Sequence, residues 1–151
     1  MEGVLLSVHV LAAIVFVGGS AVAASLFPRY APVAVAVPDA GDGGDRSRPV
    51  AVAMHRITRV YGVLGIVVPV VGIVLAAVQG RMGEVWISIS MVLTVLAGLL
   101  LALGIAPLQR DALAEPDGGR RLRLLGMLAG GYNLLWAVVV VLMIVRPGGT
   151  T

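Results

Sequence analysis

The sequence predicts an all-α protein, an integral membrane four-helix bundle made of two antiparallel hairpins. Hydrophobic residues make up 59% of the 151 residues and charged residues only 13%, whereas about 25% of a typical soluble domain is charged. A water-soluble chain of this length could not bury so much apolar surface, but lipid accepts it. Four apolar runs also reach the length of about 20 residues that a membrane-spanning helix needs.

Each apolar run predicts one span of a single transmembrane domain that covers residues 1–151. The first run has no basic residue before it and is longer than the apolar core of a signal peptide, which has about 7–15 residues. We therefore interpret it as a retained helix. Pro69 lies inside the second run and predicts a kink there. The predicted spans cover residues 4–27, 60–79, 85–108 and 122–145.

The connections predict two hairpins and one longer loop. The stretch QGRMGE, residues 79–84, predicts a tight turn between the second and third spans, and AEPDGG, residues 114–119, predicts another between the third and fourth. Residues 38–49, PDAGDGGDRSRP, are rich in Gly, Asp and Pro and predict a flexible loop between the first two spans.

The arginines predict the orientation of the bundle. All 11 basic residues are arginines, and nine of them lie on one side of the predicted topology. Because basic loops stay in the cytoplasm, we expect a multi-pass protein of the cell (inner) membrane. Its 38–49 loop is then cytoplasmic, and its N- and C-termini are outside. The nine are Arg29, Arg46, Arg48, Arg56, Arg59, Arg110, Arg120, Arg121 and Arg123.

Composition and motifs exclude several classes of function. The chain has neither cysteine nor lysine, which excludes thiolate metal sites, Schiff-base chemistry and a P-loop lysine. The arginines lie at helix ends rather than along one face, so we expect no nucleic-acid partner. The sequence has no nucleophile elbow, HExxH motif or intramembrane carboxylate pair, so we expect no catalytic residues and no metal site. The use of arginine for every basic residue fits an actinobacterial origin.

His9 is the only ionisable side chain well inside an apolar run, and such residues deserve a functional hypothesis because lipid makes them costly. Three hypotheses stay open. Neutral His9 hydrogen-bonds another helix, where the partners at similar depth are Ser88, Ser90 and Thr94. Alternatively it is an axial ligand of haem b, with Met91 as the second ligand closest in depth. In the third hypothesis it relays protons or contacts a quinone.

The second histidine cannot complete a bis-histidine haem with His9. His9 lies 18 residues before Phe27, the inner end of the first span, which is about 27 Å along a helix axis. His55 lies at or beyond the inner membrane face. Any second iron ligand must therefore come from the outer half, where Met143 lies farther out than Met91.

Small residues predict where helices approach closely, because lipid supplies no hydrophobic drive between helices. Gly126 and Gly130 form a GxxxG pair in the fourth span, and Gly18 and Gly19 form a patch in the first. Either pair could pack inside the bundle or form an interface with a second copy or a larger complex. The pattern alone leaves both interpretations open.

Basic residues at the predicted inner face form two further candidate sites. They lie at helical spacing near the anionic headgroups, where they would anchor the helices or dock a lipid phosphate or a partner protein. These residues are His55, Arg56, Arg59, Arg120, Arg121 and Arg123.

Two stretches carry a family resemblance over about 50 residues in all. LSVHVLAAIVFVGGSAVAASLFPRYAP, residues 6–32, and HRITRVYGVLGIVVPVVGIVLA, residues 55–76, resemble the first two helices of small four-helix membrane proteins. The grouping comprises DUF2269-like proteins, copper-resistance protein D domains and HemJ-type protoporphyrinogen oxidases. Resemblance to the HemJ-type enzymes implies haem ligation by His9. Those enzymes also use a lysine, which this chain lacks, and the uncharacterised branch fits best.

These features lead to three expected functions. The small-residue faces, the arginine-rich rim and the missing catalytic motifs favour a non-catalytic accessory or scaffold subunit of a membrane complex, or a homo-oligomer in the lipid bilayer. The alternative is a haem b- or quinone-binding redox protein that uses His9. The third is a small transporter that acts as an oligomer.

Overall fold

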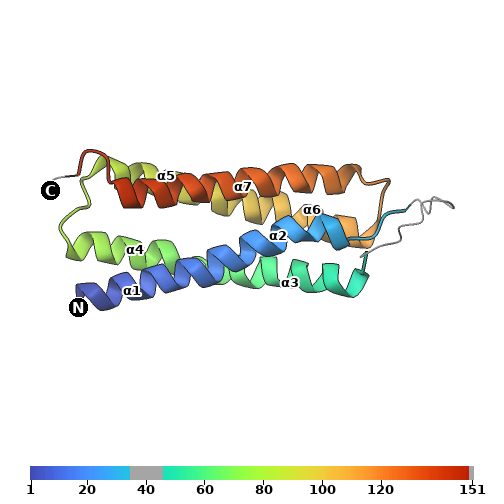
Figure 1. Cartoon of the computed structure of the whole chain (residues 1–151), viewed down its shortest axis with the longest axis horizontal. Helices are drawn as coiled ribbons and strands as arrows, with labels where there is room; N and C mark the ends of the chain where they lie inside the picture. The colour runs from blue at the N-terminus through green and yellow to red at the C-terminus, as the bar shows by residue number, and fades with distance from the viewer. Residues whose placement is uncertain (35–45, 150–151) are drawn as a thin grey trace.

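The chain forms four long helices that pack as a bundle (Figure 1). They are seen in a computed structural model, of which residues 1–34 and 46–149 are described. All four helices are long and apolar enough to cross a membrane. The predicted fold class is therefore confirmed, and this is an all-α multi-pass membrane protein. The long helices cover Glu2–Tyr30, Arg48–Val78, Val85–Ala114 and Arg120–Val145.

The first three long helices are divided into shorter segments, and only the fourth is continuous. Two of the divisions are short π-helical stretches, which are often found at functional sites. The first helix consists of α1 (Glu2–Ala12), η1 (Ala13–Val17) and α2 (Gly18–Tyr30). The second consists of α3 (Arg48–Leu64) and α4 (Val67–Val78). The third consists of α5 (Val85–Leu99), η2 (Leu100–Ile105) and α6 (Ala106–Ala114), and the fourth is α7 (Arg120–Val145).

The break between α3 and α4 confirms the predicted kink and places it one turn before the proline. Pro69 has no N–H, so it cannot donate the helical hydrogen bond to the carbonyl of Gly65. That carbonyl instead accepts from the backbone N–H of Val68 at 3.0 Å. The helix therefore tightens into a turn at residues 65–66 before α4 begins.

The two ends of the bundle differ, and we name them by what they carry. At the termini end lie both chain ends and the turn from α4 to α5 (Figure 1). At the loop end lies the turn from α6 to α7, together with the adjoining ends of α2 and α3. Of the predicted flexible loop, residues 38–45 lie outside the described residues, whereas Arg48 and Pro49 form the first turn of α3.

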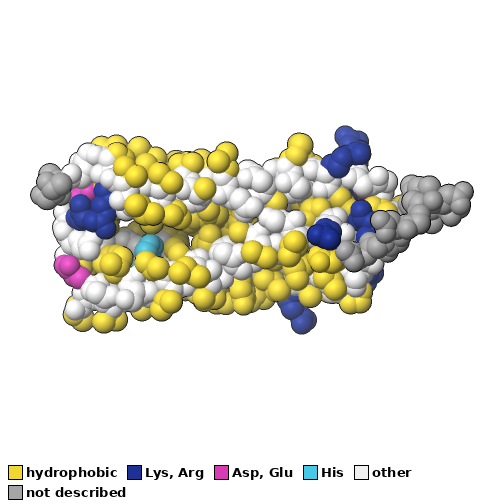
Figure 2. All heavy atoms as spheres, viewed as in Figure 1, with side chains coloured by type: hydrophobic (Ala, Val, Ile, Leu, Met, Phe, Trp, Pro, Cys, Tyr) yellow, Lys and Arg dark blue, Asp and Glu magenta, His cyan; other side chains and the backbone are white. Residues whose placement is uncertain are grey.

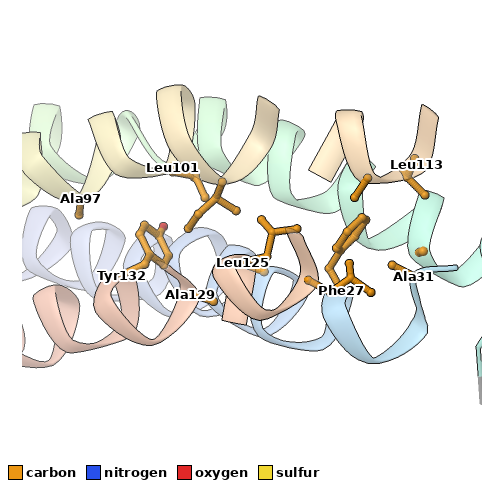
Figure 3. Close-up of a cluster of buried hydrophobic side chains, with 13 residues drawn as sticks. Phe27, Ala31, Ala97, Leu101, Leu113, Leu125, Ala129 and Tyr132 are labelled. Carbon is orange, nitrogen blue, oxygen red and sulfur yellow. The ribbon is translucent and has the colours of Figure 1, made fainter. Parts of the chain in front are cut away.

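The loop end is closed by a continuous hydrophobic core. Phe27 of α2, Ile105 of η2 and Leu125 of α7 are completely buried there, and smaller side chains let the backbones approach (Figure 3). Two polar side chains, Thr58 and Gln109, are also fully buried at this end. The core therefore joins all four long helices in the half of the bundle that holds the loops.

The termini end is more open. There α1 packs mainly against α4, and α5 packs mainly against α7, whereas few contacts join α4 to α5. Cavities lie between these two pairs and are described below. Large apolar side chains cover the outside of the bundle, including Leu103, Met127 and Ile144, which are 70% exposed or more. Such a surface suits lipid rather than water.

The glycine pairs differ in their surroundings. A Cβ on Gly19 would overlap the ring of Tyr61, so α2 approaches α3 closely at this point. Gly18, Gly126 and Gly130 have open space where a Cβ would lie. Gly126 and Gly130 are exposed on α7, so the interpretation that they pack inside the bundle is wrong. The interface interpretation stays a prediction.

Candidate cofactor site at the termini end

His9 lies on the inner side of α1, where the residue is 9% exposed. Its Nδ1 is 3.0 Å from the backbone carbonyl oxygen of Val68 in α4. A carbonyl can only accept, so Nδ1 carries the proton and donates it. The expected hydrogen bond from His9 to another helix is present, but its partner lies on the second long helix and not on the third. That contact holds the ring in one tautomer and orientation.

Gly72 allows the imidazole to come this close to α4. A Cβ at Gly72 would lie 2.9 Å from His9 Cε1 and 3.3 Å from Nδ1. Any larger residue would displace the ring from the Val68 carbonyl. Val68 and Gly72 are four residues apart on α4, so they lie on one face of that helix. Hydropathy could not reveal this arrangement, because neither a backbone carbonyl nor a lone glycine is a distinctive signal.

A cavity of about 250 Å³ opens beside His9, between the α1–α4 and α5–α7 pairs. Its wall is mostly apolar, with a small number of polar groups. Figure 2 shows a hollow on this face near the termini end, with a histidine side chain inside it. Among the described residues, no group hydrogen-bonds His9 Nε2, so its lone pair is free for a ligand. The lining residues with polar or sulfur atoms include His9, Ser90, Met91, Met143 and Arg146.

Ser90 is a second polar group on this wall that could bind a ligand. Ser90 is 3% exposed, and its hydroxyl is buried without a hydrogen-bond partner. A serine within a helix often bonds the carbonyl four residues earlier, as Ser7 and Ser25 do in this bundle. An unpaired buried hydroxyl costs about 1–3 kcal/mol. A polar ligand or a water in the cavity would remove that cost.

Met91 is about as many residues from the start of its helix as His9 is from the start of α1. His9 is seven residues from Glu2 at the start of α1, and Met91 is six residues from Val85 at the start of α5. Both helices begin at the termini end (Figure 1), so the two residues are about 10 Å and 9 Å along their helices. Met143 is only two residues from the end of α7. The structure thus brings His9 and Met91 to one cavity, with Met143 nearer its mouth.

The rim of the cavity carries charge and an indole ring. Glu84 accepts a hydrogen bond from Arg81 Nε at 2.6 Å and another from the indole of Trp86. These two bonds, with Arg81 the larger cause, hold the pKa of the Glu84 carboxyl below its usual value. The guanidinium groups of Arg81 and Arg146 each lie 5.9 Å from the Trp86 ring centroid. From the sequence, none of these residues was assigned to a site.

A second cavity, of about 260 Å³, continues toward the middle of the bundle. It shares Pro69, Ile73 and Met91 with the first. Its wall includes Tyr132, whose hydroxyl lies 2.9 Å from Ser20 Oγ, and Trp136, whose indole N–H is buried without a partner. The two cavities together therefore extend from the termini end past the level of His9.

The residues predicted to dock lipid or protein lie at the loop end. His55 Nδ1 donates to Gln109 Oε1 at 3.1 Å, which ties α3 to α6. Arg121 donates to the carbonyl of Glu115 at 2.6 Å, which stabilises the turn before α7. These two residues thus have structural contacts within the bundle. The exposed members of the set are Arg56, Arg59, Arg120 and Arg123.

Comparisons with family models, curated proteins and solved structures find no match to this chain. The chemistry of the site must therefore be argued from its own residues. A fixed imidazole with a free Nε2 can ligate a metal or accept a proton. The apolar wall suits a lipid-soluble molecule, and the described residues include no cluster of three or more His, Cys, Asp or Glu that could hold a bare metal ion.

Proposed function

We propose that this protein binds haem b in the termini-end cavity, with His9 Nε2 as an axial ligand of the iron. The hydrogen bond from His9 Nδ1 to the Val68 carbonyl carries the proposal. Histidines that ligate metals usually donate their other ring N–H to a carbonyl or carboxylate, which fixes the tautomer and the ring orientation. His9 has this arrangement through the Val68 carbonyl.

Met91 would supply a second ligand to the iron in this proposal, because it lines the same cavity as His9. Met143 lines the same cavity but lies only two residues from the end of α7. A haem with His and Met ligands supplies one-electron transfer at a raised potential. The residues of the chain hold the ring, exclude water with an apolar wall and set the iron's ligands. The orphaned Ser90 hydroxyl fits a site that an incoming group completes.

The positive-inside bias supports the location of this site. Nine of the 11 arginines belong to the predicted cytoplasmic side. Both termini, and with them His9, then lie toward the outer face of the cell membrane. The resemblance of the first two helices to a grouping that includes HemJ-type proteins supports the same cofactor, without implying their oxidase activity.

An absorbance spectrum tests the proposal. The protein, expressed with ample haem and purified in mild detergent, should show a Soret band and an α-band after dithionite. His9→Ala should remove both bands, whereas His55→Ala, the matched control, should keep them. Met91→Leu should retain haem but lower its midpoint potential, because a methionine ligand raises it. A colourless wild-type protein, or one that carries only an extractable quinone, would overturn the haem assignment.

A second candidate function is that of an accessory or scaffold subunit, and the outer face of α7 favours it. Gly126 and Gly130 are exposed there with open space above them. Asn133, one turn further on, is also exposed and donates to Ser25 at 2.9 Å. An amide at a lipid-facing surface is costly, and small residues allow another helix to approach closely. We propose that this face contacts a second copy or a larger membrane complex.

The absence of native cysteine allows a clean test of that face. In native membranes, Gly130→Cys should form an oxidative crosslink, whose mass separates a homodimer from a complex with another protein. Gly98→Cys, on an exposed part of α5 that also has open space, should crosslink less. If Gly130→Cys stays monomeric under oxidation, α7 is a lipid-facing helix and the accessory role loses its support.

A further inference from the structure

Arg146 ends α7 in an unusual backbone conformation. Its φ of 48° and ψ of 57° are left-handed, and it is the only non-glycine residue with positive φ among the described residues. Its N–H donates to the carbonyl of Leu142 at 2.9 Å, which closes the helix. Glycine or asparagine adopts this conformation more readily than arginine. The position thus accepts local strain while presenting a long basic side chain.

The Arg146 side chain lies at the mouth of the His9 cavity. Its guanidinium lies 5.9 Å from the Trp86 ring centroid, and its Nε donates to the carbonyl of Met143 at 3.3 Å. The nearby carboxylate, Glu84, is already bound by Arg81 and by the Trp86 indole. Among the described residues Arg146 forms no ion pair. One positive charge therefore remains at the mouth of an apolar cavity.

A ligand that fits this site needs two different parts. Its body must be apolar, because the wall around His9 is built mainly from aliphatic side chains and methionine. Its outer edge must carry an anion that can meet a guanidinium, which binds carboxylate with two parallel hydrogen bonds. With His9 about 10 Å from the start of α1, the anion would lie at the membrane surface while the body reaches the imidazole.

We propose that Arg146 binds a carboxylate of the cofactor, so that the site selects a ligand with an acidic edge directed toward the termini end. This inference rests on the proposed haem site and assigns the two propionates of haem b to this edge. The Trp86 ring lies within cation–π distance of the Arg146 guanidinium. Arg81 and Glu84 complete the rim but neutralise one another at 2.6 Å.

The test compares haemin with haemin dimethyl ester, in which both propionates are uncharged. Full-length protein freed of haem is titrated with each compound in detergent, and the Soret shift gives Kd. The wild type should bind haemin at least about tenfold more tightly than the diester, as one charge-assisted hydrogen-bonded pair allows. Arg146→Asn, which suits the left-handed backbone, should lose this preference while binding the diester as the wild type does.

Each remaining outcome has a defined meaning. Arg123→Asn, an exposed arginine at the loop end, is the matched control and should keep the wild-type preference. If Arg146→Asn weakens both compounds equally, Arg146 acts only through the fold, and the inference is overturned. Equal binding of both compounds by the wild type also overturns it, while the haem site stands. Failure of the wild type to bind either compound would instead overturn the proposed function itself.

Discussion

Gly19 shows how one residue sets the distance between two helices. The Tyr61 ring lies over Gly19. The same ring packs edge-on against Phe16, with ring centroids 5.9 Å apart. A Cβ at Gly19 would lie within 2.5 Å of Tyr61 Cε2. The aromatic ring cannot move aside freely because Phe16 restrains it.

We therefore expect Gly19→Ala to destabilise the bundle by about 1–3 kcal/mol, the usual cost of overpacking. The measurement is the free energy of unfolding in mild detergent. Gly18→Ala is the matched control, because the neighbouring site has open space, and it should be neutral or slightly stabilising. Equal effects of both substitutions would show that the Tyr61 contact does not set this helix distance.

The two histidines also show what can be predicted at the residue scale. Sequence reasoning singled out His9 because an ionisable group inside an apolar run is rare. It placed the hydrogen-bond partner on the wrong helix, since serine and threonine side chains are visible in a sequence and a backbone carbonyl is not. The interpretation of His55 as an interfacial group stays a prediction, and its half-buried side chain also donates to Gln109.

A buried polar chain joins two elements at the loop end. Gln109 of α6 accepts from His55 and donates to Thr58 Oγ1 of α3 at 3.3 Å, and Thr58 donates to the Met54 carbonyl at 3.0 Å. Gln109 and Thr58 are fully buried, so each bond replaces one that water would otherwise make. These hydrogen bonds thereby fix the register of α3 against α6.

Gln109→Leu should destabilise this end of the bundle by about 1–3 kcal/mol. Thr58 Oγ1 would lose the hydrogen bond that it accepts from Gln109, and His55 Nδ1 would lose the oxygen to which it donates. Thermal unfolding in detergent measures the change. Arg110→Gln, at the adjacent exposed position, should have no comparable effect. If the proposed haem is bound, its spectrum should be unchanged in both variants, since the His9 cavity is at the other end.

At the scale of elements, the sequence predicted the kink in the second long helix but not the π-helical segments of the first and third. Pro69 predicted the break between α3 and α4 because proline always lacks an N–H. The π-helical segments η1 and η2 had no such signal, because ordinary apolar residues form them. Their positions depend on how each helix packs against its neighbours.

The orientation of the whole molecule is the next prediction to test. The positive-inside bias places both termini outside the cytoplasm. A phosphatase that is active only outside the cytoplasm should therefore work when fused at Thr151 and be inactive when fused at Gly118, in the turn between α6 and α7. A cytoplasmic Thr151 would reverse the bundle and place the His9 cavity at the inner face.

The sequence by itself determined that this is a four-span helical membrane protein, and it identified the histidine that the candidate site is built on. Length, hydropathy and the rarity of charge in apolar runs act along the chain and need no tertiary information. The tertiary structure was needed to show that Val68 and Gly72 hold His9, that Arg146 lies at the mouth of the cavity and that Gly126 faces outward. These outcomes depend on the rotation of each helix about its axis. Because lipid accepts apolar side chains on every face, the sequence pattern contains little information about that rotation.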